Sequence, residues 1–235
     1  MKVPNMDDVV KTYLGEDPPL RKNSWWMPKN PFRMIVCGAT GYGKTNLMLF
    51  MLLRCMKYDR LTLCAKMATE PKYEFLKQFF EELKAEGVME DAFQWYDKLE
   101  DLPPYEQYPD RDGTTRVLIF DDMVNERDQQ KIEDYFIMGR KKDISIFYLA
   151  QRYTEVPKMV RQNADNFITF DQRPKEVPII YQDLVSGDLS LPEFRKMFKE
   201  ATKTRHDTLM IQRNPEVPEL RYRKNLTEYF VRDSM

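Results

Sequence analysis

The fold of this chain is decided by the stretch RMIVCGATGYGKT, residues Arg33–Thr45. Its first part, Arg33–Cys37, is a short and mostly apolar run that ends at a glycine, which predicts a buried strand. Its second part, Gly38–Thr45, fits the pattern G-x-x-x-x-G-K-[ST] at every fixed position. The following segment, Asn46–Lys57, is apolar on nearly every face and predicts a helix buried inside the protein. The motif therefore stands between a strand and a helix, which is the context that a phosphate-binding loop requires.

This phosphate loop is expected to bind a nucleotide. The chain has 8 glycines, and three of them lie in the loop, because backbone N–H groups can converge on a phosphate most easily where residues lack a Cβ atom. We expect Lys44 to reach the β- and γ-phosphates and the Thr45 hydroxyl to bind Mg²⁺. A tight turn without a ligand is the alternative, but it would not need the Lys-Thr pair. The predicted nucleotide-binding residues are Gly38, Ala39, Thr40, Gly41, Tyr42, Gly43, Lys44 and Thr45.

Two carboxylates follow a second apolar strand. The strand is Thr115–Phe120, and Asp121 and Asp122 come directly after it. In open α/β sheets, ligands bind at the carboxyl ends of parallel strands, so these acids are expected beside the phosphate loop. Asp121 would hold Mg²⁺ through water, and Asp122 would be the general base that orients or deprotonates the attacking water. Alternatively, the pair only caps the next turn.

Two further polar residues flank another buried strand, Ile144–Ala150. Gln151 ends this strand, where its amide could reach the γ-phosphate or the attacking water, or where it could be only a loop residue. Arg140 precedes the same strand. It is a candidate arginine finger toward the nucleotide of a neighbouring subunit, or a surface cation that neutralises a helix terminus.

The remaining pattern alternates strands and helices, and the core strands are nearly continuous apolar runs. Such strands are buried on both faces, which predicts an α/β fold with a mostly parallel central sheet and helices on both sides. Residues 1–30 carry four prolines and no sustained period, so we expect an irregular N-terminal arm that packs through Trp25, Trp26 and Met27, followed by a single domain over 31–235. The other expected elements are strands at 60–65, 165–170, 208–212 and 220–223, helices at 71–87, 126–142, 158–163, 176–184 and 191–201, and a long connection at 94–113.

The composition excludes several classes of protein. The 37 Lys and Arg balance 38 Asp and Glu, which argues against a protein that coats nucleic acid through a large positive net charge. A near-neutral net charge still allows a local basic strip. The longest uncharged apolar run is Leu47–Leu53, so no membrane-spanning segment is expected. The three cysteines have no C-x-x-C spacing and are expected to be buried thiols. One histidine, His206, cannot supply a multi-histidine metal site.

Taken together with three later segments, these motifs resemble the FtsK–HerA superfamily of P-loop motor ATPases. The segments are Met138–Ile144, Tyr148–Arg152 and Val156–Asp165, and the resemblance covers about 30–224, including the closing pattern Leu209–Ile211 and Leu220–Arg223. Within the superfamily, the chain resembles the genome-packaging ATPases of poxvirus-like viruses, large nucleocytoplasmic viruses and virophages. The Arg140–Gln151 segment carries most of the discrimination, because the phosphate loop is common to many families.

The resemblance implies a RecA-like P-loop NTPase core in which the strand ending at Gln151 separates the Walker A strand from the Walker B strand. It also implies a homo-oligomeric ring, commonly a hexamer or pentamer, that uses ATP and Mg²⁺ to drive double-stranded DNA into a viral capsid. Expected partners are therefore duplex DNA and a portal-vertex or inner capsid protein, in the virus factory of the host cytoplasm or in the virion. Arg140 matches the arginine finger, with Arg152 and Arg161 as alternatives.

The chain departs from the superfamily pattern at the residue expected to act as the general base. Many FtsK-type motors have Asp-Glu where this chain has Asp121-Asp122, so Glu126 or a residue from a neighbouring subunit is an alternative to Asp122. Candidate DNA contacts are Lys199–Arg205, Arg221–Lys224 and the loop after Asp122, each of which could also be a solvated face.

Two other functions remain open at this stage. A P-loop nucleoside or nucleotide kinase has a similar length and the same loop, but the chain has no compact arginine cluster for a lid. A nucleotide-dependent capsid-assembly factor without turnover is the third class. Stimulation of ATP hydrolysis by duplex DNA separates the motor from the kinase, and turnover itself separates it from the assembly factor.

Overall fold

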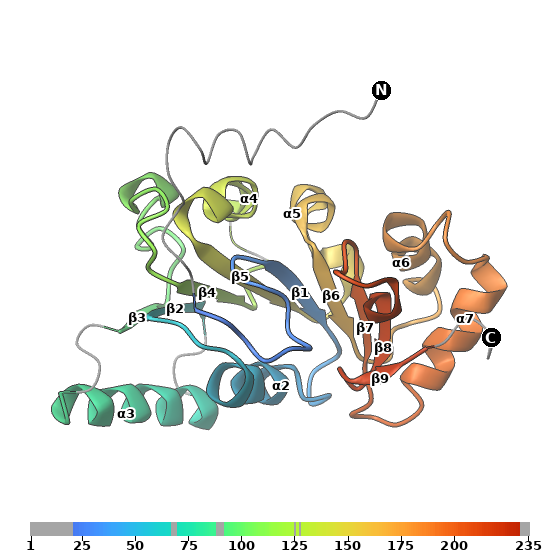
Figure 1. Cartoon of the computed structure of the whole chain (residues 1–235), viewed down its shortest axis with the longest axis horizontal. Helices are drawn as coiled ribbons and strands as arrows, with labels where there is room; N and C mark the ends of the chain where they lie inside the picture. Colours follow the sequence, from blue (N-terminus) through green and yellow to red (C-terminus); the bar gives the residue numbers. More distant parts are fainter. Residues whose placement is uncertain (1–20, 67–69, 88–91, 125, 127, 231–235) are drawn as a thin grey trace.

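The computed structural model describes residues 21–66, 70–87, 92–124, 126 and 128–230. In this part of the chain one mixed sheet forms the centre of the molecule (Figure 1). Its strands are β1 (Arg33–Cys37), β2 (Arg60–Ala65), β3 (Phe93–Tyr96), β4 (Arg116–Asp121), β5 (Ile144–Ala150), β6 (Asn166–Thr169), β7 (Leu209–Gln212), β8 (Tyr222–Lys224) and β9 (Glu228–Tyr229).

The order of the strands places the predicted motifs side by side. Across the sheet it is β3-β2-β4-β5-β1-β6-β7-β8-β9. The strands from β3 through β6 pair in parallel, and β7, β8 and β9 extend the sheet in antiparallel fashion. The predicted α/β class with a mostly parallel sheet is confirmed. β5 lies between β4 and β1, which is the strand order that the resemblance implied.

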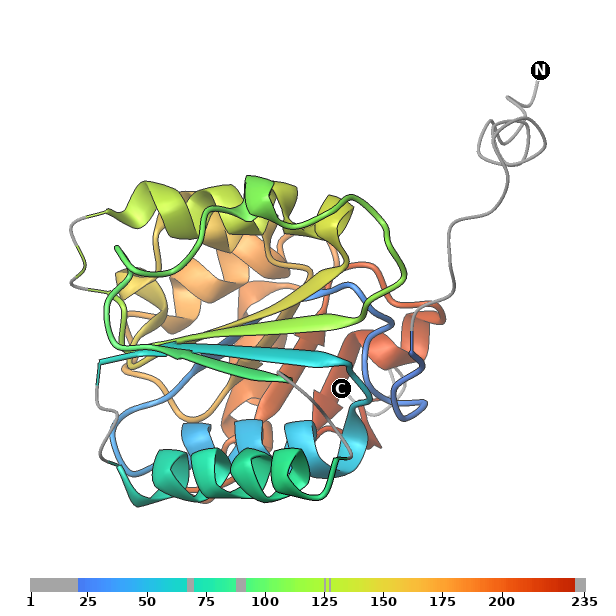
Figure 2. The same ribbon diagram turned by 90° about the vertical axis from the view of Figure 1, so that its left-hand side faces the viewer.

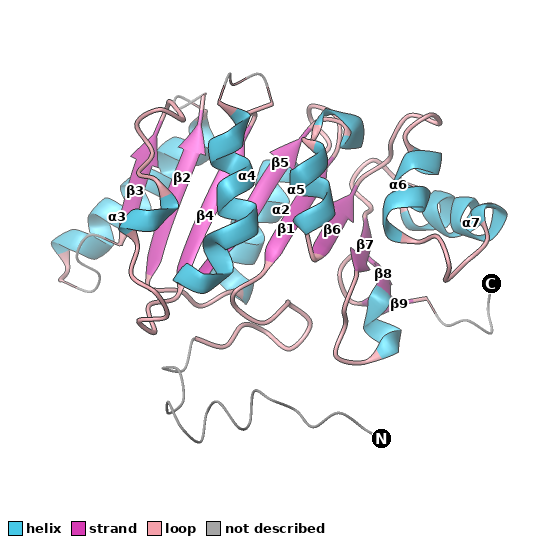
Figure 3. Ribbon diagram, turned by 90° about the horizontal axis from the view of Figure 1, so that it is seen from above, coloured by secondary structure: helices cyan, strands magenta, loops and turns pink. Residues whose placement is uncertain are grey.

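Helices cover both faces of the parallel part of the sheet, as Figures 1 and 2 show. On one face lie α2 and α3, and on the other lie α4 and α5, while α6 and α7 pack beside the antiparallel end (Figure 3). The helices are α2 (Lys44–Phe50), which continues as a π-helical turn over Met51–Cys55, α3 (Pro71–Ala85), α4 (Gln129–Met138), α5 (Lys158–Asn163), α6 (Val177–Leu184) and α7 (Leu191–Ala201). None of these described helices is long and apolar enough to cross a membrane.

The core has two layers, one on each face of the sheet. Successive residues of a strand point to opposite faces. In β1, Met34 and Val36 therefore pack with α2 and α3, whereas Ile35 and Cys37 pack with the opposite layer. All four are at most 1% exposed. Burial on both faces explains why the strands are continuous apolar runs. Cys37, Cys55 and Cys64 are buried thiols, as predicted.

Several expected elements have different bounds. The connection predicted at 94–113 contains β3, a short half-exposed edge strand that exists because it pairs with β2. β4 extends one residue further than predicted, so Asp121 is its last residue rather than the residue after it. The helix predicted at 126–142 is regular only over Gln129–Met138 and ends in a 3₁₀ turn over Gly139–Lys142, while the strand predicted at 220–223 begins at Tyr222.

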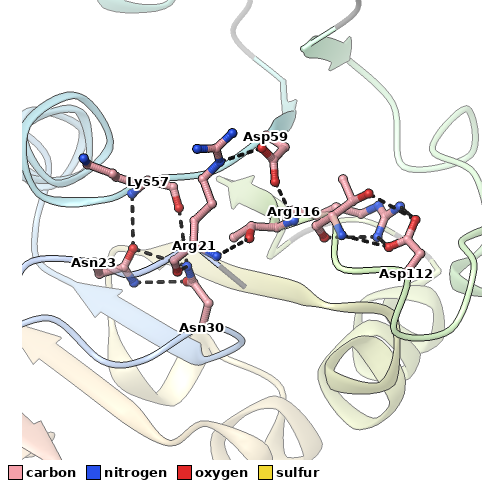
Figure 4. A network of polar contacts seen from close by, with 9 residues as sticks. Arg21, Asn23, Asn30, Lys57, Asp59, Asp112 and Arg116 are labelled. Atoms are coloured by element: carbon pink, nitrogen blue, oxygen red, sulfur yellow. Dashed lines mark hydrogen bonds and ion pairs between the residues drawn. The ribbon is translucent and has the colours of Figure 1, made fainter. Parts of the chain in front are cut away.

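Residues 21–32 contain turns but no helix or strand, and they are fixed at the amino-terminal edge of the parallel strands (Figure 4). Arg21 pairs with Asp59 at 2.6 Å, and the Asn30 side chain donates to the Arg21 carbonyl at 2.8 Å. Met27 is buried as expected, but Trp25 is 70% exposed and does not anchor the segment. Residues 1–20 of the predicted arm lie outside the described residues.

Candidate functional site: the phosphate loop and its cavity

The phosphate loop leaves the carboxyl end of β1 and is fixed by the two neighbouring strands. The Gly38 N–H donates to the Ala150 carbonyl at 3.1 Å, and the Phe170 N–H donates to the Cys37 carbonyl at 2.9 Å. A Cβ atom on Gly38 would lie 2.7 Å from the Phe170 ring, so no larger residue fits there. Gly43 precedes α2 with a φ of +108°, a backbone conformation that residues with a Cβ atom rarely adopt. Packing and backbone geometry therefore both require glycine in this loop.

One cavity of about 650 Å³ unites most of the predicted site residues. Because β4, β5 and β1 are parallel neighbours, their carboxyl ends meet at one edge of the sheet. Gly38, Ala39 and Tyr42 shape the loop without lining the cavity. The predicted residues that line it are Thr40, Gly41, Gly43, Lys44, Thr45, Asp121, Asp122 and Gln151.

Lys44 is held across the loop. Its ammonium group donates to the Gly38 carbonyl at 2.7 Å. Burial lowers the pKa of Lys44, and the carboxylates that face it, Asp121 foremost, act in the opposite direction. A half-buried ammonium in this position can exchange its carbonyl partner for phosphate oxygens, which are stronger, charged acceptors.

Asp121 and Thr45 both interact with the Tyr73 hydroxyl. Tyr73, from the first turn of α3, donates a hydrogen bond to Asp121 Oδ2. Burial raises the pKa of Asp121 to about 6, while the Tyr73 bond and the charge of Lys44 lower it. The pKa of Tyr73 is raised by burial and by Asp121, and a hydrogen bond with Thr45 acts against that rise. The hydroxyl of Thr45 and the carboxylate of Asp121 are thus close together, and hard oxygen donors of this kind suit Mg²⁺.

The two candidate general bases, Asp122 and Glu126, occupy different positions relative to the cavity. Asp122 has a φ of +57° at the end of β4, and its exposed side chain lines the cavity. Asp tolerates this left-handed conformation better than most residues do. Glu126 pairs with Lys66 at 2.6 Å and does not line the cavity. Of the two candidate bases, Asp122 is therefore the one that faces the cavity.

Arg140 lies at the opposite edge of the sheet from the cavity of its own chain. It belongs to the 3₁₀ turn that precedes β5, whereas Gln151 follows β5, and seven residues of strand span about 20 Å. Arg140 is exposed and lines a separate cavity of about 260 Å³ beside Trp26 and Asp165. Within the described residues it forms no ion pair.

The two alternative finger arginines are already engaged. Arg152 pairs with Glu155 at 3.1 Å. Arg161 pairs with Asp183 and stacks on the Tyr153 ring at 5.0 Å from its centre. Arg152 and Arg161 are each less exposed than Arg140.

Among the residues that line the cavity, the structure adds four titratable side chains that the sequence patterns did not indicate. Glu70, Lys72 and Tyr73 come from the start of α3, and His206 comes from the segment between α7 and β7. The second predicted strand ends at Ala65, and the helix start Glu70-Pro71 is the next element after it. Because β2 neighbours β4, this helix start was a usable signal for the first three residues. No local pattern indicated His206.

Two arginines of the basic stretch Arg221–Lys224 are engaged within the fold. Arg221 pairs with Asp188 at 2.9 Å. Arg223 is fully buried and donates to the carbonyls of Trp26 at 2.7 Å and Leu226 at 2.9 Å. These contacts argue against a role of Arg221 and Arg223 in binding DNA.

Comparisons with known proteins agree with this geometry. The genome packaging NTPase B204 from Sulfolobus turreted icosahedral virus 2 in complex with sulfate has a TM-score of 0.57 at 14% identity, covering 84% of this chain and 96% of that chain. The same protein in complex with ATP-gammaS has a TM-score of 0.55 at 16% identity, covering 82% of this chain and 96% of that chain. At these identities, the similarity establishes the fold. No curated protein sequence gave a significant match.

The sequence also matches a family model directly. The model is described as Poxvirus A32 protein, and it matches residues 22–215. That range contains β1, the phosphate loop, the Asp121-Asp122 pair and Gln151, which are the elements that build the cavity. The chain therefore belongs to the poxvirus A32 protein family and is a viral genome-packaging ATPase.

Proposed function

We propose that this packaging ATPase is a ring-forming motor that hydrolyses ATP with Mg²⁺ and moves double-stranded DNA into a capsid. The observation that carries the proposal is the convergence of Lys44, Asp121, Asp122 and Gln151 on one cavity beside the phosphate loop. These side chains come from three neighbouring parallel strands or the loops that follow them, so the sheet itself fixes their spacing.

The loop and Lys44 bind the phosphates. Backbone N–H groups of the loop surround the β-phosphate, and the ammonium group of Lys44 neutralises charge on the β- and γ-phosphates. Thr45 and Asp121 would hold the magnesium ion, and Tyr73 keeps the Asp121 carboxylate in place. When bound, the ion neutralises charge that develops on the phosphate oxygens.

Asp122 and Gln151 act on the water. Asp122 accepts a proton from a water molecule whose oxygen forms a new bond to the γ-phosphorus, while the bond from that phosphorus to the bridging oxygen breaks. The products are ADP and inorganic phosphate. Gln151, at the end of the adjacent strand, orients the same water or the γ-phosphate with its amide.

Arg140 completes the site of a neighbouring subunit. Its position at the far edge of its own sheet and its exposure support a role in trans rather than in cis. A ring in which each arginine faces the cavity of the next subunit is a heterologous, closed assembly. Such a ring, a hexamer or a pentamer, would act in the cytoplasmic virus factory or on the virion, docked to a portal-vertex or inner capsid protein.

The test is the rate of ATP hydrolysis by the purified protein with magnesium, with and without blunt duplex DNA, together with negative-stain images in an ATP analogue. We expect rings and a rate that rises with duplex DNA. Phosphate transfer to a nucleoside or nucleotide without DNA stimulation would identify a kinase instead. Nucleotide binding without any turnover would identify an assembly factor.

A further inference from the structure

The segment between α7 and β7 lies against the phosphate loop. His206 Nδ1 is 3.0 Å from the Tyr42 carbonyl oxygen, although 164 residues separate the two in the sequence. A carbonyl oxygen only accepts, so Nδ1 must carry the hydrogen in this contact. The Arg205 guanidinium lies 5.7 Å from the centre of the Tyr42 ring. Two adjacent residues thus contact the loop through its backbone and through its one aromatic side chain.

Arg205 also comes close to the backbone of the loop itself. A Cβ atom built on Gly41 would lie 2.7 Å from a guanidinium nitrogen of Arg205. Gly41 lines the cavity and has a φ of +79°, so glycine here serves both the conformation and the approach of Arg205. The guanidinium is therefore positioned beside the part of the loop that surrounds phosphate.

The segment is anchored by the sheet rather than free to move away. The Thr204 N–H donates to Asp207 Oδ2 at 3.0 Å. Asn225, just after β8, donates to Asp207 Oδ1 at 3.0 Å and accepts from the Thr208 N–H at 3.0 Å. The antiparallel extension of the sheet thus presents Arg205 and His206 in a fixed place, which lowers the entropy lost when they bind a ligand.

The charge of Arg205 is not neutralised locally. Its side chain is exposed, and among the residues that the structure describes it forms no ion pair. Arg221 differs in this respect, because it pairs with Asp188 at 2.9 Å. A guanidinium is always charged and has a planar array of donors that matches phosphate oxygens.

We propose that Arg205 is a nucleotide-binding residue that contacts phosphate oxygens in cis, and that His206 is a positioning residue that holds the Tyr42 turn of the loop. The inference rests on the proposed nucleotide site and adds an arginine, next to Gly41, to the lysines that line the cavity. It also takes Arg205 out of the candidate DNA-contact stretch Lys199–Arg205. In this assignment, each subunit uses one arginine in cis to bind the nucleotide and receives another in trans for turnover.

The test compares Arg205→Ala and Arg205→Lys with Lys203→Ala, a control that removes a charge from the same segment. Affinity is measured by titration with a fluorescent ATP analogue, and folding is checked by thermal unfolding without nucleotide. We expect Arg205→Ala to weaken ATP binding by roughly 10- to 100-fold, the loss of one charge-assisted hydrogen bond. Arg205→Lys should recover part of it, and Lys203→Ala should bind as the wild type does.

His206 is tested with a conservative pair. His206→Asn keeps a side-chain donor for the Tyr42 carbonyl and should retain most of the affinity, whereas His206→Ala should lose several-fold. Equal affinities of the two variants would remove the positioning role.

Two further results would overturn the assignment of Arg205. Unchanged nucleotide binding by Arg205→Ala would refute this inference alone, and a loss of duplex-DNA affinity in the same variant would identify a DNA contact instead. Failure of the wild-type protein to bind the ATP analogue would refute the proposed function as well.

Discussion

The position of Arg140 leads to a quantitative prediction about mixed rings. Because about 20 Å of strand β5 separates Arg140 from the cavity of its own subunit, Arg140→Ala should leave nucleotide affinity unchanged. Turnover should nevertheless fall by roughly 10³-fold or more, the usual effect of losing an arginine finger. Lys141→Ala removes the neighbouring exposed cation and should change neither quantity.

The decisive assay mixes two inactive proteins. Lys44→Ala subunits keep the arginine but lack a working loop, and Arg140→Ala subunits keep the loop but lack the arginine. In an equimolar random ring, a boundary is productive when an intact loop meets an intact arginine, which occurs at one half times one half, or about one quarter, of boundaries. If boundaries fire independently, the mixture should recover about one quarter of the wild-type rate, whatever the number of subunits.

Recovery should follow the mixing ratio. The rate should be highest at equal amounts and fall toward zero as either variant dominates. Native mass spectrometry of the same samples verifies that the rings are mixed. No recovery in verified mixed rings would contradict a trans role for Arg140. Arg152 or Arg161 would then be the next candidate, or the arginine would act within its own subunit.

Three other predictions follow from the site and its surroundings. Lys44→Ala should lose both affinity for an ATP analogue and turnover, because the ammonium acts on ground and transition states alike; undiminished hydrolysis would sink the assignment of the cavity. Asp122→Asn should still bind nucleotide while turnover drops by roughly 10²-fold or more, and Asp121→Asn should shift the magnesium dependence itself; small, equal effects on both measurements would leave the pair as a turn cap. Hydrogen bonding to Arg116 holds the pKa of Asp112 below its ordinary value of 3.8, so the pair stabilises the fold above about pH 4 and less as the pH falls. Asp112→Asn should therefore lower the melting temperature at pH 7 by calorimetry, with a difference that shrinks toward pH 2; a difference independent of pH would contradict this origin.

The sequence by itself determined the phosphate loop, the bounds of β1, β2 and β5, and the alternation of strands and helices around them. These features are local. A glycine pattern followed by Lys-Thr has few alternative uses, and a strand buried on both faces must be apolar throughout. The same locality allowed Asp121, Asp122 and Gln151 to be placed at one edge of the sheet, because parallel strands all end there.

Only the tertiary structure decided which residues from distant parts of the chain reach the cavity. Tyr73 reaches Asp121 because β2 pairs with β4, and His206 reaches Tyr42 because β7 extends the sheet beyond β6. The two late basic stretches look alike in sequence. Arg223 is buried against backbone carbonyls, whereas Arg205 stands beside the phosphate loop. Strand pairing across long sequence separations sets these contacts, and no local periodicity encodes it.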